Sequence, residues 1–209
     1  MDDHDDPYRR CGLRANPFAH GDGGPQDAAG WVDRGLPAAA EPGRHRLVQV
    51  IGVKGAGKTS TLQRWRAVAP GPWRYVPPGI QRLRPLPVAP LVYWDEADRA
   101  PAALRWWGWR AAARSGATIV AGTHVDLGAE AQAAGLAVHS VVLCTITVEE
   151  LTVWAAQRFA GVSAEPGWVL PKHVAADVAA CAGASWRVAG DLLHAWVARE
   201  VAARDASGG

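Results

Sequence analysis

A glycine-rich segment in the first third of the chain has the residue types and spacing for phosphate chemistry. Residues 52–59 read Gly-Val-Lys-Gly-Ala-Gly-Lys-Thr and follow a short, apolar, β-branched run. Glycines at this spacing let backbone N–H groups turn toward phosphate oxygens, a lysine adds positive charge at the β and γ phosphates, and a following hydroxyl can bind Mg²⁺. The pattern predicts a phosphate-binding loop for ATP and Mg²⁺. Its residues are Gly52, Val53, Lys54, Gly55, Ala56, Gly57, Lys58, Thr59 and Ser60.

Two adjacent carboxylates follow a second apolar run and supply the complementary chemistry. Residues 90–96 read Pro-Leu-Val-Tyr-Trp-Asp-Glu, the form of a Walker B element. Asp95 is then expected to bind Mg²⁺ together with Thr59. Glu96 is expected to orient and deprotonate the water that attacks the γ phosphate. Together the two segments favour an ATPase. A phosphotransferase acting on a small molecule is less favoured, because Glu96 beside Asp95 suits the activation of water.

The surrounding sequence predicts the elements that position these residues. Strand-like and helix-like stretches alternate, which is typical of a parallel sheet with crossover helices. We expect an α/β fold, a three-layer αβα P-loop NTPase with a five-stranded, mostly parallel sheet and a small C-terminal helical lid. The predicted divisions are an N-terminal segment at 1–43, an ATPase core at 44–146 and the lid at 147–205. The strands are expected near 46–51, 73–76, 90–94, 118–121 and 138–143.

Polar groups beyond the two central motifs are candidates for sensing the γ phosphate. The strand at 118–121 is expected beside the acidic strand and ends in Gly-Thr-His, so Thr123 is the first choice and His124 the second. Thr147 and Glu150 form a capping box for the first lid helix. Pro171 is expected to open the next helix and Ser185 to cap the third, which places Arg187 in the first turn of that helix.

Length, composition and charge limit the functional classes. The chain has 209 residues, 49% of them apolar, which suits one α/β domain and a small appendage. Cys11, Cys144 and Cys181 have no metal-binding or redox spacing, and neither a secretory signal nor a membrane span is evident, so we expect a cytoplasmic protein. Residues 44–114 hold thirteen Lys or Arg and three acids, a net +10. This basic half is a candidate face for DNA or an acidic protein, or simply a solvated, arginine-rich surface.

The basic half contains a proline-rich connection and a tryptophan-rich helix, each with a predicted placement. The proline-rich connection at 77–90 is expected to be a surface excursion. A helix predicted at 101–115 carries Trp106, Trp107 and Trp109 between arginines. These indoles suit base stacking or a protein contact, but we favour two of them facing the sheet and one at the surface.

The motifs together resemble the AAA+ ATPases, and among them the ExeA-type group of secretion and transposition systems. The similarity covers most of the chain. Residues 12–18, Gly-Leu-Arg-Ala-Asn-Pro-Phe, are similar to a segment that precedes the core in that group and lies near the adenine, which nominates Asn16 and Phe18. Residues 95–99 and 121–127 resemble its Walker B and sensor segments, and residues 182–187 resemble its sensor 2 turn, which nominates Arg187.

One departure from the AAA+ pattern bears on turnover. Such rings place a trans-acting arginine before the fifth strand, yet no Lys or Arg occurs between Arg114 and Arg158. Because an arginine finger accelerates hydrolysis by about 10³ to 10⁵, intrinsic hydrolysis is expected to be slow unless a partner supplies one. Oligomerisation remains compatible with the sequence. The alternative function is therefore an ATP-gated switch that binds DNA or a protein with little hydrolysis of its own.

Overall fold

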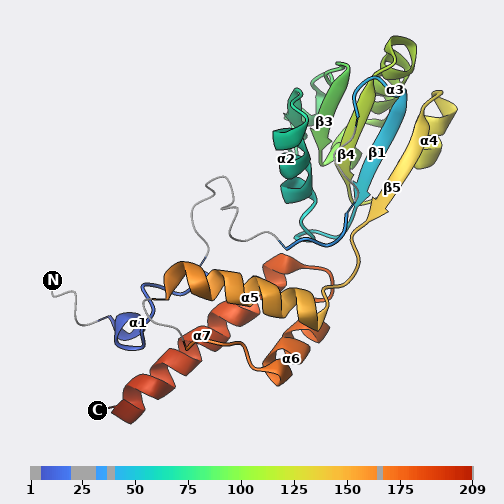
Figure 1. The fold of residues 1–209 in the computed structure, drawn as a ribbon. Coiled ribbons are helices and arrows are strands. Elements are labelled where there is room, and N and C mark those ends of the chain that lie inside the picture. Colours follow the sequence, from blue (N-terminus) through green and yellow to red (C-terminus); the bar gives the residue numbers. More distant parts are fainter. Residues whose placement is uncertain (1–5, 20–31, 37–40, 164–166, 209) are drawn as a thin grey trace. The chain divides into compact units, whose positions relative to one another are not determined.

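The computed structural model describes residues 6–19, 32–36, 41–163 and 167–208, and the chain divides into two compact units. One unit spans Gly35–Cys144 and contains the sheet. The other combines Met1–Arg34 with Thr145–Gly209 and is helical in its described parts. The N-terminal stretch therefore groups with the C-terminal helices. Each unit is described by itself below, with labels as in Figure 1.

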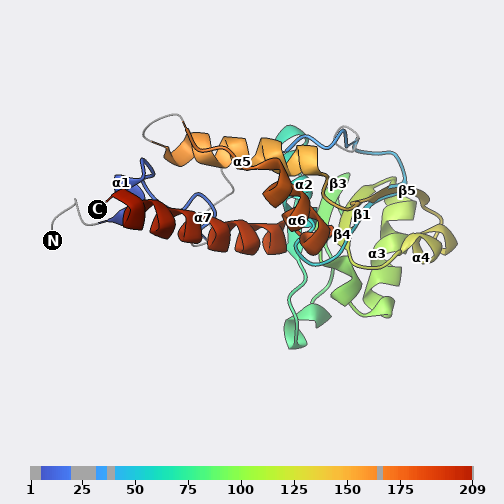
Figure 2. The ribbon, with the colours of Figure 1, turned by 90° about the horizontal axis from the view of Figure 1, so that it is seen from below.

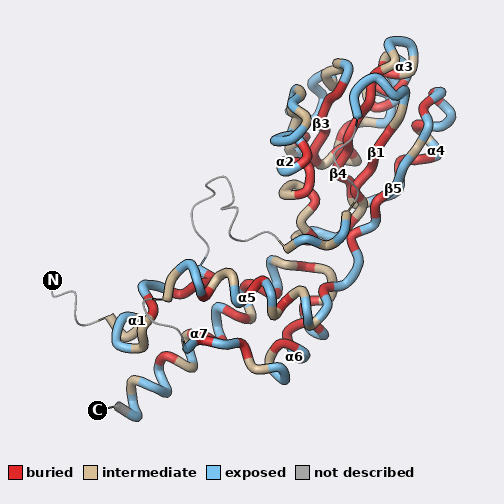
Figure 3. Tube along the Cα trace, viewed as in Figure 1, coloured by how far each residue is buried: buried red, intermediate tan, exposed pale blue. Residues whose placement is uncertain are grey.

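The sheet unit is built on a five-stranded parallel sheet with the order β2-β3-β4-β1-β5. Its strands are β1 (Arg46–Ile51), β2 (Trp73–Tyr75), β3 (Leu91–Asp95), β4 (Thr118–Thr123) and β5 (Ala137–Val142). The central strands β3 and β4 are buried along their whole length, as expected for parallel strands covered on both faces (Figure 3). The predicted fold class and all five predicted strands are confirmed.

Helices cover both faces of this sheet and make it the middle of three layers (Figure 1). On one face, α2 (Lys58–Val68) buries Leu62 and Trp65 against β1, β3 and β4. On the other face, α3 (Ala102–Ser115) and α4 (Gly128–Ala133) pack on the opposite side chains of β1, β3 and β4. The helix α3 ends at Gly116, whose φ of 75° is the left-handed conformation that glycine adopts readily at a helix end.

The tryptophans of α3 are placed differently from the expectation that two of them face the sheet. Only Trp109 is buried, with its ring centroid 4.7 Å from that of Trp94 on β3. A Cβ at position 108 would come within 2.4 Å of the Trp94 indole, so glycine is needed there. The buried residues of α3 share one helical face, so Trp106 and Trp107 project from the other side; the buried set is Arg105, Gly108, Trp109 and Ala112.

The connection between β2 and β3 is only partly the predicted surface excursion. Its first half forms the 3₁₀ helix η2 (Ile80–Leu83), whose Ile80 is 81% exposed. Its second half packs: Leu86 and Val88 contact the core on the α3 face, and the Trp94 Nε1 donates a hydrogen bond to the Pro87 carbonyl at 2.9 Å. A second 3₁₀ helix, η3 (Ala97–Arg99), follows β3 directly.

The helical unit has its own aromatic core. Its helices are α1 (Pro7–Arg10), α5 (Val148–Val162), α6 (Lys172–Ala182) and α7 (Trp186–Gly208). The middle helix of the C-terminal three, α6, packs against both α5 and α7 (Figure 2). The capping box of Thr147 and Glu150 is confirmed by hydrogen bonds of 2.9 and 3.1 Å. None of the described helices has both the length and the apolar composition needed to cross a bilayer.

Candidate functional site

The 52–59 loop joins β1 to α2 at the carboxyl edge of the sheet. Gly55 and Gly57 have φ angles of 86° and 96°, which side-chain-bearing residues adopt only with strain, so these two glycines set the shape of the loop. Gly52 is close to Ala56 and Leu143, leaving little room for a Cβ. The loop thus directs the chain into the N-terminus of α2, where free N–H groups and the helix dipole favour an anion.

Lys58 is the first residue of α2 and its side chain folds back over the loop. The Nζ donates hydrogen bonds to the carbonyl oxygens of Gly52 at 2.9 Å and Val53 at 3.0 Å. Burial lowers the pKa of Lys58 from its ordinary value, and the nearby carboxylates of Glu96, Asp98 and Asp95 partly oppose this shift. A buried ammonium group held at the mouth of the loop is well placed to exchange these carbonyl contacts for phosphate oxygens.

Thr59 and Asp95 meet across the sheet edge. The Thr59 hydroxyl donates to the Asp95 Oδ2 at 2.9 Å, which ties α2 to the end of β3. Asp95 is only 1% exposed, and its Oδ1 is buried with no hydrogen-bond partner among the described residues. Burial is the main cause that raises the Asp95 pKa above its ordinary value, and the hydrogen bond from Thr59 opposes it.

These two side chains fit the Mg²⁺ that the sequence predicts. A hydroxyl and a carboxylate are hard oxygen donors of the kind that Mg²⁺ prefers. A cation would also satisfy the orphaned Oδ1, which otherwise carries a desolvation cost. Gly122 on β4 leaves space for this carboxylate, because a Cβ there would lie 2.9 Å from Oδ1.

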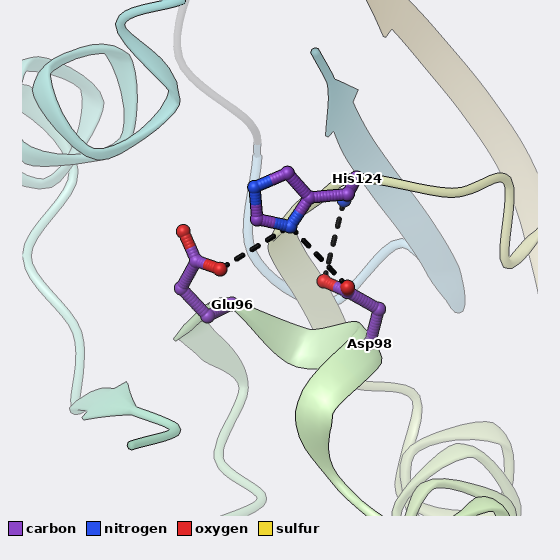
Figure 4. A group of neighbouring side chains, drawn as sticks. All are labelled: Glu96, Asp98 and His124. Carbon is purple, nitrogen blue, oxygen red and sulfur yellow. Dashed lines mark hydrogen bonds and ion pairs between the residues drawn. The ribbon is translucent and has the colours of Figure 1, made fainter. Parts of the chain in front are cut away.

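Glu96 is held in a strained backbone conformation, with its carboxylate between the side chains of Arg99 and His124. Its φ of 59° and ψ of 42° are left-handed, which is uncommon for a residue other than glycine. Its Oε2 lies 3.1 Å from the Arg99 guanidinium. The same oxygen lies 3.2 Å from the His124 Nδ1 (Figure 4). Backbone strain that packing maintains is found preferentially at functional sites.

His124 connects Glu96 to a second carboxylate, that of Asp98. Its Nδ1 lies 3.3 Å from the Asp98 Oδ2, and its backbone N–H donates to the Asp98 Oδ1 at 3.2 Å. The three ligand-type atoms of Glu96, Asp98 and His124 lie within 4.8 Å of one another (Figure 4). The Glu96 oxygen that a metal ion would bind is already in contact with the positively charged Arg99 guanidinium, which would repel the ion. The cluster is therefore better explained as an ion-pair network than as a metal site.

Thr123 and His124 occupy different surroundings at the end of β4. Thr123 is fully buried, and its hydroxyl donates to the Val125 carbonyl at 2.8 Å and accepts from the Val125 N–H at 3.2 Å. That hydroxyl is thus engaged within its own turn. His124, the second choice from sequence, is the side chain that faces Glu96.

The remaining predicted residues lie outside this cluster. Val53 and Lys54 are exposed in the loop, and Ser60 is half-buried in the first turn of α2. Asn16, Phe18 and Arg187 belong to the helical unit. Their roles in nucleotide binding and sensing stay predictions.

Asn16 and Phe18 have structural partners within the helical unit. The Asn16 side chain accepts from the Phe18 N–H and donates to the His194 carbonyl, both at 3.0 Å. Phe18 is buried with its ring centroid 5.2 Å from that of Trp154. Arg187 lies in the first turn of α7 and is exposed.

Sequence reasoning assigned no role to Asp98, Arg99 or Gly122. Asp98 and Arg99 follow the acidic pair within η3, and Gly122 precedes Thr123. A left-handed residue at position 96 reverses the chain so that residues 98 and 99 return toward the carboxylate, and no sequence pattern signals such a conformation for glutamate. The role of Gly122 could have been predicted from the sequence, because a glycine near the end of the strand that pairs with β3 leaves room for the Asp95 carboxylate.

Comparisons with known proteins identify the fold. No protein-family profile matches the chain, and no curated protein matches it. Solved structures do: Cdc6p from Pyrobaculum aerophilum, at 14% identity and a TM-score of 0.50, matches 78% of this chain and 56% of its own. Two variants of RuvB from Thermotoga maritima, at 16% and 15% identity and TM-scores of 0.51 and 0.50, each match 71% of this chain and 53% of their own. The chain thus spans slightly more than half the length of these AAA+ P-loop ATPases and shares their fold.

Proposed function

We propose that this chain is a Mg²⁺-dependent ATPase of the AAA+ type, whose nucleotide state is coupled to DNA or to a partner protein. The observation that carries the proposal is the hydrogen bond between Thr59 and the buried, partly unsatisfied Asp95. It joins the 52–59 loop to the acidic strand at one edge of the sheet, beside Lys58 and Glu96. We also propose that the chain is related to the ExeA-type ATPases and that it acts in the cytoplasm.

Each residue of the cluster has a role in this proposal. The loop N–H groups and Lys58 hold the phosphates of ATP, while Thr59 and Asp95 hold the metal. Bound Mg²⁺ supplies charge neutralisation at the β and γ phosphates. Glu96 accepts a proton from water as the water oxygen bonds to the γ phosphorus and the bond to the β–γ bridging oxygen breaks. The leaving group is ADP.

His124 is proposed as the positioning residue at the tip of β4, in preference to Thr123. The Thr123 hydroxyl is already hydrogen-bonded within its turn. His124 contacts Glu96 and Asp98, and so it fixes the direction of the glutamate carboxylate. Asn16, Phe18 and Arg187 remain proposed contributions of the helical unit to adenine and γ-phosphate binding.

One observation favours the alternative, an ATP-gated switch with little hydrolysis. Arg99 and His124 both contact the Glu96 Oε2, so this oxygen is already engaged and is less available to a water molecule. The stretch between Arg114 and Arg158 also lacks a cationic residue to act as an arginine finger. In this alternative, ATP binding itself changes the partner-binding state, and a partner supplies the missing cation.

The test compares ATP binding and steady-state hydrolysis in the parent chain, Glu96→Gln and Lys58→Ala. For the ATPase, Glu96→Gln keeps Mg²⁺-ATP binding and loses turnover, whereas Lys58→Ala loses both. Glu149→Gln is the matched control, because Glu149 is an exposed glutamate on α5 and should leave both activities unchanged. Tight binding without turnover in the parent would favour the switch. Turnover in Glu96→Gln equal to the parent's would contradict the ATPase mechanism.

A further inference from the structure

The exposed face of α3 has a composition that the proposed nucleotide site does not explain. Trp107 is 76% exposed and Trp106 is 41% exposed. Large exposed aromatic side chains mark binding surfaces more often than they occur by chance, because leaving an indole in water forgoes its burial energy. Arg110 and Arg114 are exposed on the same helix, three and seven residues after Trp107. At this spacing all three project from one side of α3.

The charge on this face is positive and unneutralised within the described part of the chain. The buried arginine of the helix, Arg105, forms an ion pair with Glu130 at 2.6 Å. Arg110 and Arg114 have no carboxylate within ion-pair distance among the described residues. The Arg110 guanidinium instead lies 5.9 Å from the centroid of the Trp106 ring. The helix itself contains no acidic residue.

We propose that this α3 face, formed by Trp106, Trp107, Arg110 and Arg114, binds single-stranded nucleic acid. Unpaired bases stack on exposed indoles, and arginines beside the indoles neutralise the adjoining phosphates. Bases inside a duplex cannot reach the indole faces, so single strands are favoured over duplex. This inference names the partner class of the proposed function, and it rests on that function only for its coupling to ATP.

The size of the apolar area argues against a protein partner. A protein interface surrounds its aromatic anchors with further apolar surface and excludes charge from its centre. On α3, only the two indoles are large and exposed, and their neighbours on the face are an alanine, Ala103, and the two arginines. Two exposed indoles flanked by arginines that have no carboxylate partner among the described residues match the chemistry of stacked bases and phosphates.

The test measures binding of a fluorescent oligothymidylate of about 16 nucleotides to the full chain by anisotropy, at several salt concentrations. Trp107→Ala should weaken the affinity by roughly 5- to 100-fold, the effect of losing one stacked base, while Trp107→Phe should recover part of the loss. Arg114→Gln should reduce the slope of log affinity against log salt by about 0.7, the contribution of one phosphate contact on a single strand. Ile80→Ala, which removes an equally exposed apolar side chain from η2, should bind as the parent does.

Several results would overturn the inference. They are absence of binding by the parent at low salt, parent-like affinity of Trp107→Ala, or equal affinity of the parent for duplex and single strand. If the parent binds no oligonucleotide but self-associates in sedimentation, and Trp107→Ala abolishes the association, the face is a protein interface instead. Binding of a fluorescent ATP analogue is measured on the same preparations. A parent chain that binds the ATP analogue but no oligonucleotide refutes only this inference, and a parent chain that binds the oligonucleotide but no ATP analogue refutes only the proposed function.

Discussion

Replacing Gly122 by alanine should selectively weaken Mg²⁺-dependent ATP binding. The added Cβ would lie 2.9 Å from the Asp95 Oδ1 and 3.4 Å from the Leu62 Cδ2. Carbon and oxygen atoms are not found this close without a bond, so the carboxylate must turn away. Turning it breaks the 2.9 Å hydrogen bond from Thr59 and removes one proposed Mg²⁺ ligand from its position.

The magnitude follows from the contacts that change. The affinity loss comes from the displaced Mg²⁺ ligand: losing one contact to a charged group costs about 1.5–3 kcal/mol, which corresponds to a roughly 10- to 100-fold loss of affinity. The overpacking itself costs stability, about 1–3 kcal/mol, less the roughly 0.4–1 kcal/mol that alanine gains by restricting the unfolded chain. We therefore expect a net destabilisation between about 0 and 2.6 kcal/mol, small enough for the chain to remain folded.

The assay is titration with a fluorescent ATP analogue, once with Mg²⁺ and once with EDTA. Gly122→Ala should lose affinity with Mg²⁺ and bind nearly as the parent does in EDTA, because the loop and Lys58 are unchanged. Gly161→Ala is the control: a Cβ there meets nothing within 4 Å in helix α5, so its stability should rise slightly and its binding should not change. Parent-like Mg²⁺-dependent affinity and stability in Gly122→Ala would refute the reasoning.

Two further substitutions test the electrostatics. Asp95→Asn should raise the melting temperature of the nucleotide-free chain by a few degrees, equivalent to about 1 kcal/mol, and abolish the Mg²⁺ dependence of ATP binding. Because burial raises the Asp95 pKa, the stability cost of its charge is absent below its ordinary pKa of 3.8 and grows as the pH rises through the folded-state value. A gain in melting temperature from Asp95→Asn that persists unchanged in thermal melts at acid pH would contradict this cause. Glu130→Gln should cost about 1–2 kcal/mol at neutral pH, since it leaves the buried Arg105 without its ion pair. Arg105 holds the Glu130 pKa below its ordinary 4.5, so the carboxylate contributes stability above that pH and loses it as the pH falls through the lowered value; denaturant unfolding should show the parent and variant converging in acid, and a constant difference would argue against the pair.

The parts of the site that the sequence predicted are those set by local conformation and by strand direction. Glycines at 55 and 57 with a following lysine and threonine leave few alternatives to a loop that opens a helix, and both have the left-handed φ this requires. Parallel strands then bring the end of β3 to the same edge as the loop. The approach of Asp95 to Thr59 follows from those two facts.

The parts that the sequence did not predict depend on side-chain competition for space. Three tryptophans on α3 have similar apolar character, but only Trp109 lies on the face that packs on the sheet, where Gly108 makes room for the Trp94 indole. The short helix α4 was not predicted, because its six residues are mostly small and begin with glycine, which gives no hydrophobic period. Asn16 was assigned to the adenine from the family resemblance. Its hydrogen bond to the His194 carbonyl joins residues nearly 180 positions apart in the chain, and no local sequence pattern predicts such a contact.

The conformation of Glu96 connects the two candidate functions. Its left-handed backbone carries a steric cost of about 1–3 kcal/mol, and the ion pairs with Arg99 and His124 are the contacts that hold the side chain in that arrangement. The same two contacts occupy the Glu96 Oε2, which a water molecule would otherwise approach. In the proposed function, a γ phosphate that attracts Arg99 or His124 would free the Glu96 Oε2 for the attacking water. The hydrolysis rates of the parent and of His124→Gln test this proposed role: faster hydrolysis in His124→Gln means that the histidine restrains Glu96, and slower hydrolysis means that it positions Glu96.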